Sequence, residues 1–287
     1  MVFADAGVLL SGGNFHAEPV AFAAEQERLP HRVAGTEERR GDFAAAETAF
    51  RAALASDSFR AAMPLYTLLV PERVDDFAGS LLDHADASGR LPIWPIWGGE
   101  TGTMIGEPAL PVLADAWAKG FRGFDGQRAL AAMVRTSTED AALSQWSVLD
   151  HYGYYPFDRV EGEAVSRTLE AGIGDDAVAR MATMLGDQAT ARRFARRAGA
   201  WRALIDPETR LARGKDSQGN WRTPFDPLMP TSPLNNPGDY TEANAWQYSW
   251  TPALFDPAGL RDAMGGAESF RTMLDRFFFA FQCSQTR

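Results

Sequence analysis

Apolar side chains recur every three or four positions along most of this chain, which is the spacing of amphipathic helices. Within 41–89 the residues Phe43, Ala46, Phe50 and Leu54 follow it, and three helices fit that stretch. The same spacing predicts further helices over 104–121, 125–135, 163–185, 187–204, 257–264 and 267–281. Alternating strand patterns are almost absent. The pattern therefore predicts an all-α protein.

Three segments between the predicted helices are too rich in Pro, Gly or aromatic residues for regular structure. Segment 91–102 reads LPIWPIWGGETG, and 152–158 reads YGYYPFD. Segment 206–239 carries prolines at six positions together with several Gly and Asn residues. We expect shaped loops here, because long loops inside compact domains commonly carry function.

Composition removes several classes of protein. The 287 residues carry a net charge of -10, which argues against nucleic-acid binding through charge alone. The single cysteine, Cys283, excludes a disulfide framework and a cysteine-based zinc cluster. No apolar run approaches the roughly 18 to 20 residues of a membrane helix, so no membrane span is expected. The first residues lack a basic region, and we identify no export signal there.

The segment 240–250, YTEANAWQYSW, holds the most informative group of side chains. The carboxylate of Glu242 stands there among aromatic and amide residues: Tyr240, Asn244, Trp246, Gln247, Tyr248 and Trp250. Aromatic faces stack on pyranose rings, amides bind hydroxyl pairs, and a carboxyl among apolar rings has a raised pKa suited to a general acid. This combination is typical of a sugar site.

A purely structural interpretation of the same segment stays open. Trp246 and Trp250 are four residues apart and could both face the core from one helix. Glu242 would then cap the start of that helix.

Four segments in order resemble glycoside hydrolase family 92, the calcium-dependent exo-acting α-mannosidases. They are SDSFRAAMPLYTLLVPERV (56–74), LPIWPIWGGETGTMIGEPALPVLADAWAKGFRGFD (91–125), YGYYPFDRVEGEAVSRTLEAGIGDDAVARMA (152–182) and YTEANAWQYSWTPALFDPAGLRDAMGG (240–266). The resemblance covers roughly 55–281. Four motifs that occur in the order of the family identify it far more specifically than any single motif does.

The resemblance implies an (α/α)6 toroid-like helical barrel with long irregular loops, and removal of terminal α-linked mannose, α-1,2-linked above all, from mannosides or N-glycans. The family reaction inverts the anomeric centre: a glutamic acid protonates the leaving oxygen while an aspartate activates water on the opposite face. By motif, Glu242 is the general acid, Asp57 holds the terminal mannose and Arg60 follows in the same motif. Ca²⁺ is the implied cofactor, and the family is usually exported.

Further substrate-binding residues are expected around this acid. Asn244, Trp246 and Gln247 follow it in the motif. Trp94 and Trp97 either line the mouth of the sugar pocket or pack their loop onto the barrel.

The sequence departs from the family pattern at several points. Ser56 replaces a tryptophan, Ala243 a glycine and Pro108 a histidine. The chain stops at Arg287, before the downstream segment that supplies the general base and much of the calcium environment in the family. We therefore expect an incomplete barrel over 41–287, preceded by an unmatched segment 1–40.

These departures keep two other functions open. One is a non-catalytic remnant that binds mannose or serves as a helical scaffold. The other is a tetratricopeptide-like interaction module, suggested by the segment 41–55.

Other polar groups favour structural roles. Asp175 and Asp176 could approach a cation, although a solvated face or a capping contact is the simpler expectation. Four arginines at helical spacing predict a solvated basic face: Arg192, Arg193, Arg196 and Arg197. The four histidines show no metal-ligand spacing: His16, His31, His84 and His151.

Overall fold

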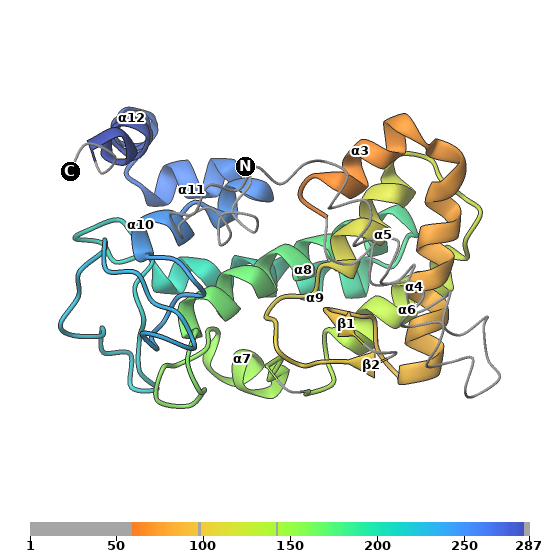
Figure 1. Cartoon of the computed structure of the whole chain (residues 1–287), viewed down its shortest axis with the longest axis horizontal. Helices are drawn as coiled ribbons and strands as arrows, with labels where there is room; N and C mark the ends of the chain where they lie inside the picture. Colours follow the sequence, from red (N-terminus) through yellow and green to blue (C-terminus); the bar gives the residue numbers. More distant parts are fainter. Residues whose placement is uncertain (1–58, 97–98, 142, 284–287) are drawn as a thin grey trace, which may run out of the picture. The chain divides into compact units, whose positions relative to one another are not determined.

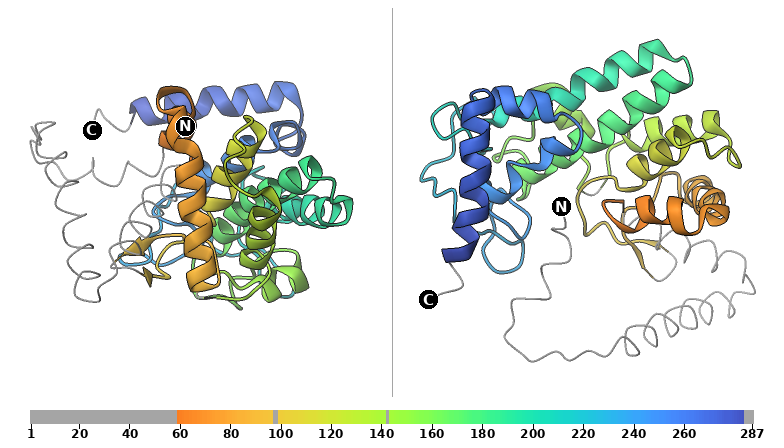
Figure 2. Two further views of the ribbon diagram at one scale, coloured as in Figure 1. Left: turned by 90° about the vertical axis from the view of Figure 1, so that its right-hand side faces the viewer. Right: turned by 90° about the horizontal axis from the view of Figure 1, so that it is seen from above.

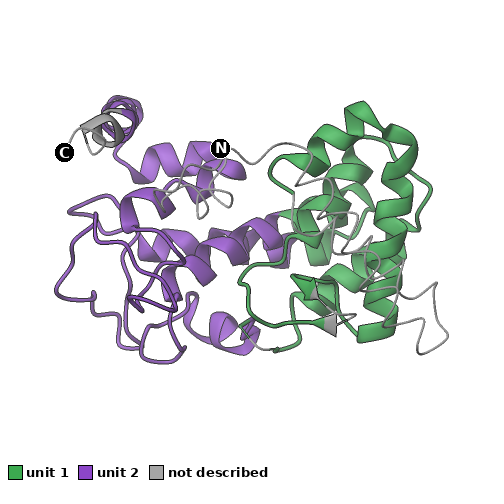
Figure 3. Cartoon of the chain, viewed as in Figure 1, with its two compact units in different colours: residues 1–143, 177–191 green, residues 144–176, 192–287 purple. Residues whose placement is uncertain are grey.

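The computed structural model of the chain describes residues 59–96, 99–141 and 143–283. It divides into two compact units, coloured separately in Figure 3. Unit 1 comprises 1–143 and 177–191, and unit 2 comprises 144–176 and 192–287. The predicted boundary at residue 41 lies outside the described residues.

Unit 1 is built mainly from four helices that pack on one another (Figure 1). Its elements are α3 (Ala62–Leu69), the 3₁₀ turn η2 (Pro71–Arg73), α4 (Val74–Ser88), β1 (Pro95–Ile96), β2 (Gly99–Glu100), α5 (Ala109–Ala118) and α6 (Gly126–Thr136). The ends of two longer helices, α8 and α9, also belong to this unit.

Helix α4 shows why this part of the chain is helical. Val74, Ala78, Leu81 and Ala85 are buried on one face, at the spacing of an amphipathic helix. The helix ends at Gly89, whose φ of 91° places it in the left-handed conformation that glycine adopts without strain. The next residues are therefore free to leave the helix axis.

The start of α6 is fixed by its capping residue. The side chain of Asp125 accepts hydrogen bonds from the backbone N–H groups of Gln127 and Arg128. Gly126 lies so close to the ring of Trp117 that a Cβ atom there would come within 2.7 Å of it. Glycine at this position therefore lets α5 and α6 pack closely.

The loop over 91–102 contains a small piece of regular structure, so the expectation of none was wrong. β1 and β2 pair antiparallel, with Pro95 opposite Glu100 and Ile96 opposite Gly99. Strands of two residues give too little alternation to be recognised in a sequence.

Unit 2 contains six further helical elements and the larger part of α8 and α9. Its elements are α7 (Trp146–Tyr152), α8 (Ala164–Met184), α9 (Gln188–Ala198), η3 (Gly199–Leu204), α10 (Ala245–Tyr248), η4 (Thr251–Leu254), α11 (Pro257–Ala263) and α12 (Ala267–Cys283). Helix α7 was not predicted from the sequence. It has only seven residues, of which Trp146 and Leu149 are buried.

The core of unit 2 joins residues far apart in the chain. Its buried members include Leu169, Trp201, Tyr240, Trp250 and Phe277. The rings of Trp250 and Phe277 meet edge to face at 5.5 Å between centroids. This core therefore connects α8, the segment before α10, and α12.

The predicted irregular segment over 206–239 is confirmed as a long loop, seen between η3 and α10 in Figure 1. Two ion pairs join residues within this loop. Arg213 pairs with Asp206 at 2.9 Å, and Arg222 donates to Asp239 at 2.7 Å. Both aspartates are buried, so these ion pairs stabilise the conformation of the loop.

Two glycines separate α11 from α12. Gly265 and Gly266 have φ values of 95° and 88°, which lie in the left-handed region that favours glycine. The chain changes direction there, and Figure 2 shows α12 leaving at a steep angle to α11.

Most predicted helices are confirmed within a few residues. α5 begins at Ala109 rather than near 104, because Gly106 has a φ of 79° and Pro108 precedes the first helical residue. The last predicted residues of α9 form the 3₁₀ turn η3 instead. The all-α class is confirmed, whereas closure into a toroid stays a prediction. Within the described residues, no helix combines the length and the apolar character needed to cross a membrane.

An ion-pair network on α8 and α9 corrects two expectations. Asp175 is fully buried and receives two hydrogen bonds of 2.7 Å from Arg197. Arg197 also pairs with Asp150 at 2.9 Å, and its side chain is only 8% exposed. Asp175 thus faces an arginine rather than a bound metal ion or solvent, and Arg197 does not belong to the solvated basic face.

Substitution Arg197→Met tests this network. Burial raises the pKa of Asp175 to about 6 even though Arg197 opposes the rise. Removing the arginine leaves the carboxyl buried without its partner, so we expect the free energy of unfolding to fall by about 3 kcal/mol at pH 7. Without Arg197 the pKa of Asp175 rises further, so the loss of stability is greater at pH 8 than at pH 5.

Urea denaturation at both pH values measures the effect. Arg193→Met is the matched control, because Arg193 reaches Asp150 only at 3.6 Å and its side chain is 50% exposed. Equal stability losses in the two variants would contradict a role for burial.

Candidate functional site

The predicted site residues fall in both units, and each unit is described by itself. Arg60 and Trp94 belong to unit 1. Glu242, Asn244, Trp246 and Gln247 belong to unit 2 and lie within one short segment. Asp57 and Trp97 lie outside the described residues.

Glu242 has an unusual backbone conformation. Its φ of 46° lies in the left-handed region, which residues other than glycine rarely occupy. Such strain persists only where the surrounding structure holds it, and it concentrates at functional sites. The side chain of Glu242 is exposed, so the expected enclosure of this carboxyl by aromatic rings is not found.

The residues before Glu242 are fixed by hydrogen bonds. The hydroxyl of Thr231 accepts from the N–H of Tyr240 at 3.0 Å and donates to the carbonyl oxygen of Tyr240 at 2.6 Å. The N–H of Thr241 donates to the hydroxyl of Ser166 at 2.9 Å. Polar side chains from two other parts of the unit thus hold the approach to the carboxylate.

The residue after Glu242 is fixed as well. Ala243 forms an antiparallel bridge with Thr231, with N···O distances of 2.8 and 3.1 Å. The backbone is therefore held on both sides of Glu242, and its side chain projects to solvent from a defined position.

Asn244 and Gln247 use their amides to start α10. The Asn244 side chain accepts from the N–H of Gln247 at 2.9 Å, and the Gln247 side chain accepts from the N–H of Asn244 at 3.1 Å. This reciprocal arrangement is a capping box. Asn244, rather than Glu242, is the residue that caps the helix.

Trp246 and Trp250 are core residues, as the structural interpretation expected. Each is 9% exposed and belongs to the hydrophobic core of unit 2. The helix that carries Trp246 has only four residues, and Trp250 follows it. The guanidinium of Arg276 lies 5.5 Å from the centre of the Trp246 ring.

The two tyrosines of the segment have separate environments. Tyr240 is buried and donates from its hydroxyl to the carbonyl oxygen of Ala212 at 2.7 Å. Burial raises the pKa of Tyr240 well above its usual value, so this phenol keeps its proton. Tyr248 donates to the carboxylate of Glu170 at 3.4 Å, which joins the segment to α8.

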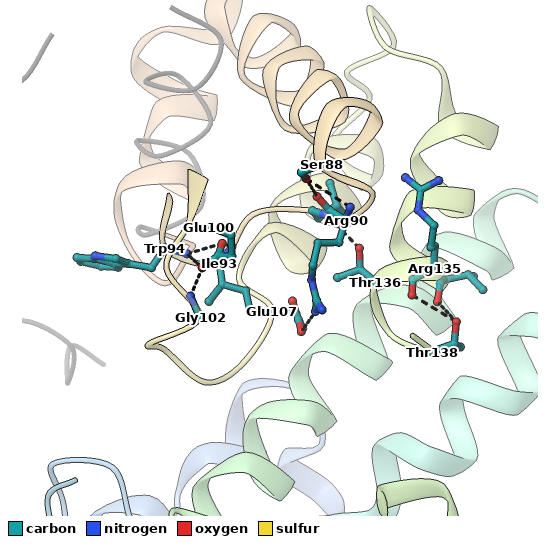
Figure 4. A network of polar contacts seen from close by, with 12 residues as sticks. Ser88, Arg90, Ile93, Trp94, Glu100, Gly102, Glu107, Arg135, Thr136 and Thr138 are labelled. Carbon is teal, nitrogen blue, oxygen red and sulfur yellow. Dashed lines mark hydrogen bonds and ion pairs between the residues drawn. The ribbon is translucent and has the colours of Figure 1, made fainter. Parts of the chain in front are cut away.

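In unit 1, one carboxylate organises the loop that carries Trp94 (Figure 4). Glu100 accepts from the backbone N–H groups of Ile93 at 2.7 Å, Trp94 at 3.1 Å and Gly102 at 3.1 Å. The hydroxyl of Thr101 donates to the carbonyl oxygen of Trp94 at 2.9 Å. The Trp94 backbone is thus held at both its polar groups, and Figure 4 shows its indole pointing away from the network.

The start of the same loop is tied to the helices of unit 1. The N–H of Leu91 donates to the hydroxyl of Thr136 at 2.9 Å. Arg90 pairs with the buried Glu107 at 2.9 Å. The loop therefore leaves α4 from a fixed point.

Arg60 makes a local contact in the described structure. Its guanidinium lies 4.3 Å from the centre of the Phe59 ring, and it is half-buried.

A cavity of about 520 Å³ lies elsewhere in unit 2. Trp246 and Arg276 line it together with residues of α12 and of the segment 208–210. Glu242 does not line this cavity. It is therefore not the place where the candidate acid would meet a substrate.

Metal binding finds no support among the described residues. Within 59–96, 99–141 and 143–283, no group of three or more His, Cys, Asp or Glu side chains could hold an ion. The residues that the structure describes do not fit the calcium site that the resemblance implies.

Two carboxylates of structural importance were missed in the sequence. Glu100 and Glu163 both bind backbone or side-chain donors in the loops that carry candidate residues. In the sequence, the feature that could have indicated Glu100 and Glu163 was their position, because each lies inside a segment that resembles the family.

Comparison with solved structures agrees with this picture. The chain is similar to an inverting mannosidase of family GH92 from Bacteroides thetaiotaomicron, with 34% identity and a TM-score of 0.70, over 76% of this chain and 29% of that one. It is also similar to a GH92 α-mannosidase from the same organism in complex with mannoimidazole, with 39% identity and a TM-score of 0.71, over 78% and 29%. The chain thus spans less than a third of either mannosidase.

A second kind of match is much shorter. A stretch of 29 residues is 69% identical to histidine ammonia-lyase from Salmonella arizonae, which is 10% of this chain and 6% of the lyase. A match of that length says nothing about the fold of the rest.

The family is nevertheless clear. The glycosyl hydrolase family 92 catalytic domain matches residues 29–287. The helical fold is similar to that of the two GH92 mannosidases. The chain belongs to glycosyl hydrolase family 92, and the tetratricopeptide interpretation is excluded.

Two substitutions at Asn244 test its structural role. Asn244→Ala removes the cap of α10, so we expect the free energy of unfolding to fall by about 1 kcal/mol in urea denaturation. Asn244→Asp keeps an oxygen in the capping position and should retain most of that stability. Equal losses in both variants would show that the amide group, and not the cap, is what matters.

Proposed function

We propose that this chain belongs to an α-mannosidase that removes terminal α-linked mannose, with Glu242 as the general acid. Family membership supports the reaction class, and the two similar structures are named as mannosidases. The substrate we propose is an α-1,2-linked mannoside or an N-glycan that ends in mannose.

The observation that carries the proposal is the state of Glu242. Its carboxylate is exposed, its φ is 46°, and hydrogen bonds fix the backbone on both sides. A general acid must lie within hydrogen-bond reach of the oxygen that it protonates, and a fixed backbone supplies that constancy of position. A strained backbone at an exposed residue does not improve packing, so a role for the side chain is the better explanation.

The proposed chemistry is inversion at the anomeric carbon. Glu242 donates its proton to the glycosidic oxygen as the bond to the sugar breaks. A second carboxylate deprotonates a water that attacks the opposite face, and the two carboxyl groups lie roughly 6.5 to 9.5 Å apart in such sites. We assign no residue of this chain to the second role.

Further substrate contacts are proposed from the motifs. The indole of Trp94 offers an apolar face to a pyranose ring. Asp57 and Trp97 keep their proposed roles in binding the terminal mannose, and Arg60 follows Asp57 in the motif. Asn244, Trp246 and Gln247 remain proposed substrate contacts from the motif, although their capping and core contacts favour support of Glu242.

Calcium is the cofactor that family membership implies, and we assign no calcium ligand to this chain. Since the described residues do not fit a metal site, no step of the proposal depends on an ion held by them.

A second function is kept because one observation favours it. The amides that were expected to bind hydroxyl groups form a capping box. A chain of this kind could bind mannose, or act as a helical scaffold, without turning it over.

Substitution Glu242→Gln decides between these functions. We measure the release of mannose from α-1,2-linked mannobiose, with calcium and again with a chelator. If Glu242 is the acid, the variant loses at least about a hundredfold in kcat/KM while its thermal unfolding is unchanged.

Glu268→Gln is the matched control, because Glu268 is an exposed carboxylate on α12. Unchanged turnover in Glu242→Gln would rule out the proposed acid. Absence of turnover in the folded wild-type chain, together with calorimetric binding of mannose, would favour the second function.

A further inference from the structure

We propose that Glu163 is a positioning residue that holds the candidate acid Glu242 in place through Thr241. This inference deepens the proposed function and rests on it. Glu163 comes directly before α8, and no motif argument drew attention to it.

Glu163 is itself firmly held. It is 7% exposed, and its φ of 57° is left-handed like that of Glu242. Its backbone N–H donates to the carbonyl oxygen of Gly238 at 2.6 Å, and its carbonyl oxygen accepts from the N–H of Arg167 at 2.8 Å. These bonds fix the backbone of Glu163 at the start of α8.

The carboxylate of Glu163 makes one short contact toward the acid. The hydroxyl of Thr241 donates to its Oε1 at 2.5 Å, within the range of hydrogen bonds to charged oxygens. The N–H of Thr241 donates to the hydroxyl of Ser166, in the first turn of α8. Thr241 is therefore held at a side-chain atom and a backbone atom by two neighbouring residues.

The consequence for Glu242 follows from the chain. Thr241 immediately precedes Glu242, and Ala243 after it is paired with Thr231. A left-handed backbone relaxes to negative φ unless both flanks are fixed. Releasing Thr241 would free one flank and change the direction in which the acid projects.

Glu163 also has a structural role, because its charge interacts with that of the buried Arg167 on α8. The hydrogen bond that its carboxylate accepts from another segment comes from Thr241, which leads to the loop of the acid.

A double-mutant cycle on the full chain tests the proposal. The variants are Glu163→Ala, Thr241→Val and both together, with Thr272→Val, at an exposed position on α12, as the matched control. We expect each single variant to lower kcat about tenfold with KM within about twofold, and the double variant to be no worse. Additive losses, or unchanged kcat, would overturn the coupling.

A second measurement keeps the test valid if the chain lacks turnover. Amide hydrogen exchange of the segment 240–244 should become about tenfold faster in both single variants, with α4 and α12 unchanged. Uniform acceleration, or none at 240–244, would overturn the positioning role. Wild-type turnover that Glu242→Gln leaves intact would sink the proposed function instead, and the exchange data would still decide whether Glu163 holds this segment.

Discussion

The left-handed backbone at Glu242 is the constraint on which the candidate site depends. A residue other than glycine stays in that conformation only where its neighbours are fixed. Thr231, Ser166 and Glu163 supply the necessary hydrogen bonds to the residues on either side. Each partner is itself anchored in the start of α8 or in the long loop. The position of one exposed carboxylate is therefore set by the packing of the whole unit.

The same principle organises the loop of unit 1. Glu100 binds three backbone N–H groups and fixes the turn that presents Trp94. In this loop, as in the segment before Glu242, a carboxylate fixes the backbone beside a candidate residue. Such loops need internal hydrogen bonds because they lack the repeated backbone pairing of helices and strands. Ion pairs at Asp206 and Asp239 stabilise the long loop in the same way.

Sequence reasoning succeeded where one local signal dominates. Helices such as α4 were predicted because their apolar spacing and glycine ends are local properties. It failed where the decisive contact is distant: Asp175 and Arg197 were both expected to face solvent, and they bury one another instead. Asn244 and Gln247 were expected to bind sugar hydroxyls, a role that stays a prediction, and the structure adds that they close a capping box. Amide groups serve either purpose equally well, so residue type alone could not decide.

The sequence by itself determined the helical class, the irregular loops and the family, because spacing and ordered motifs are properties of the chain. It also singled out Glu242 by residue type and context. Only the tertiary structure decided the conformation of that residue. Its hydrogen-bonded supports, Ser166 and Glu163, lie 75 and 78 residues before the residue that they hold. Contacts over such separations form through folding, and no local pattern encodes which partners will meet.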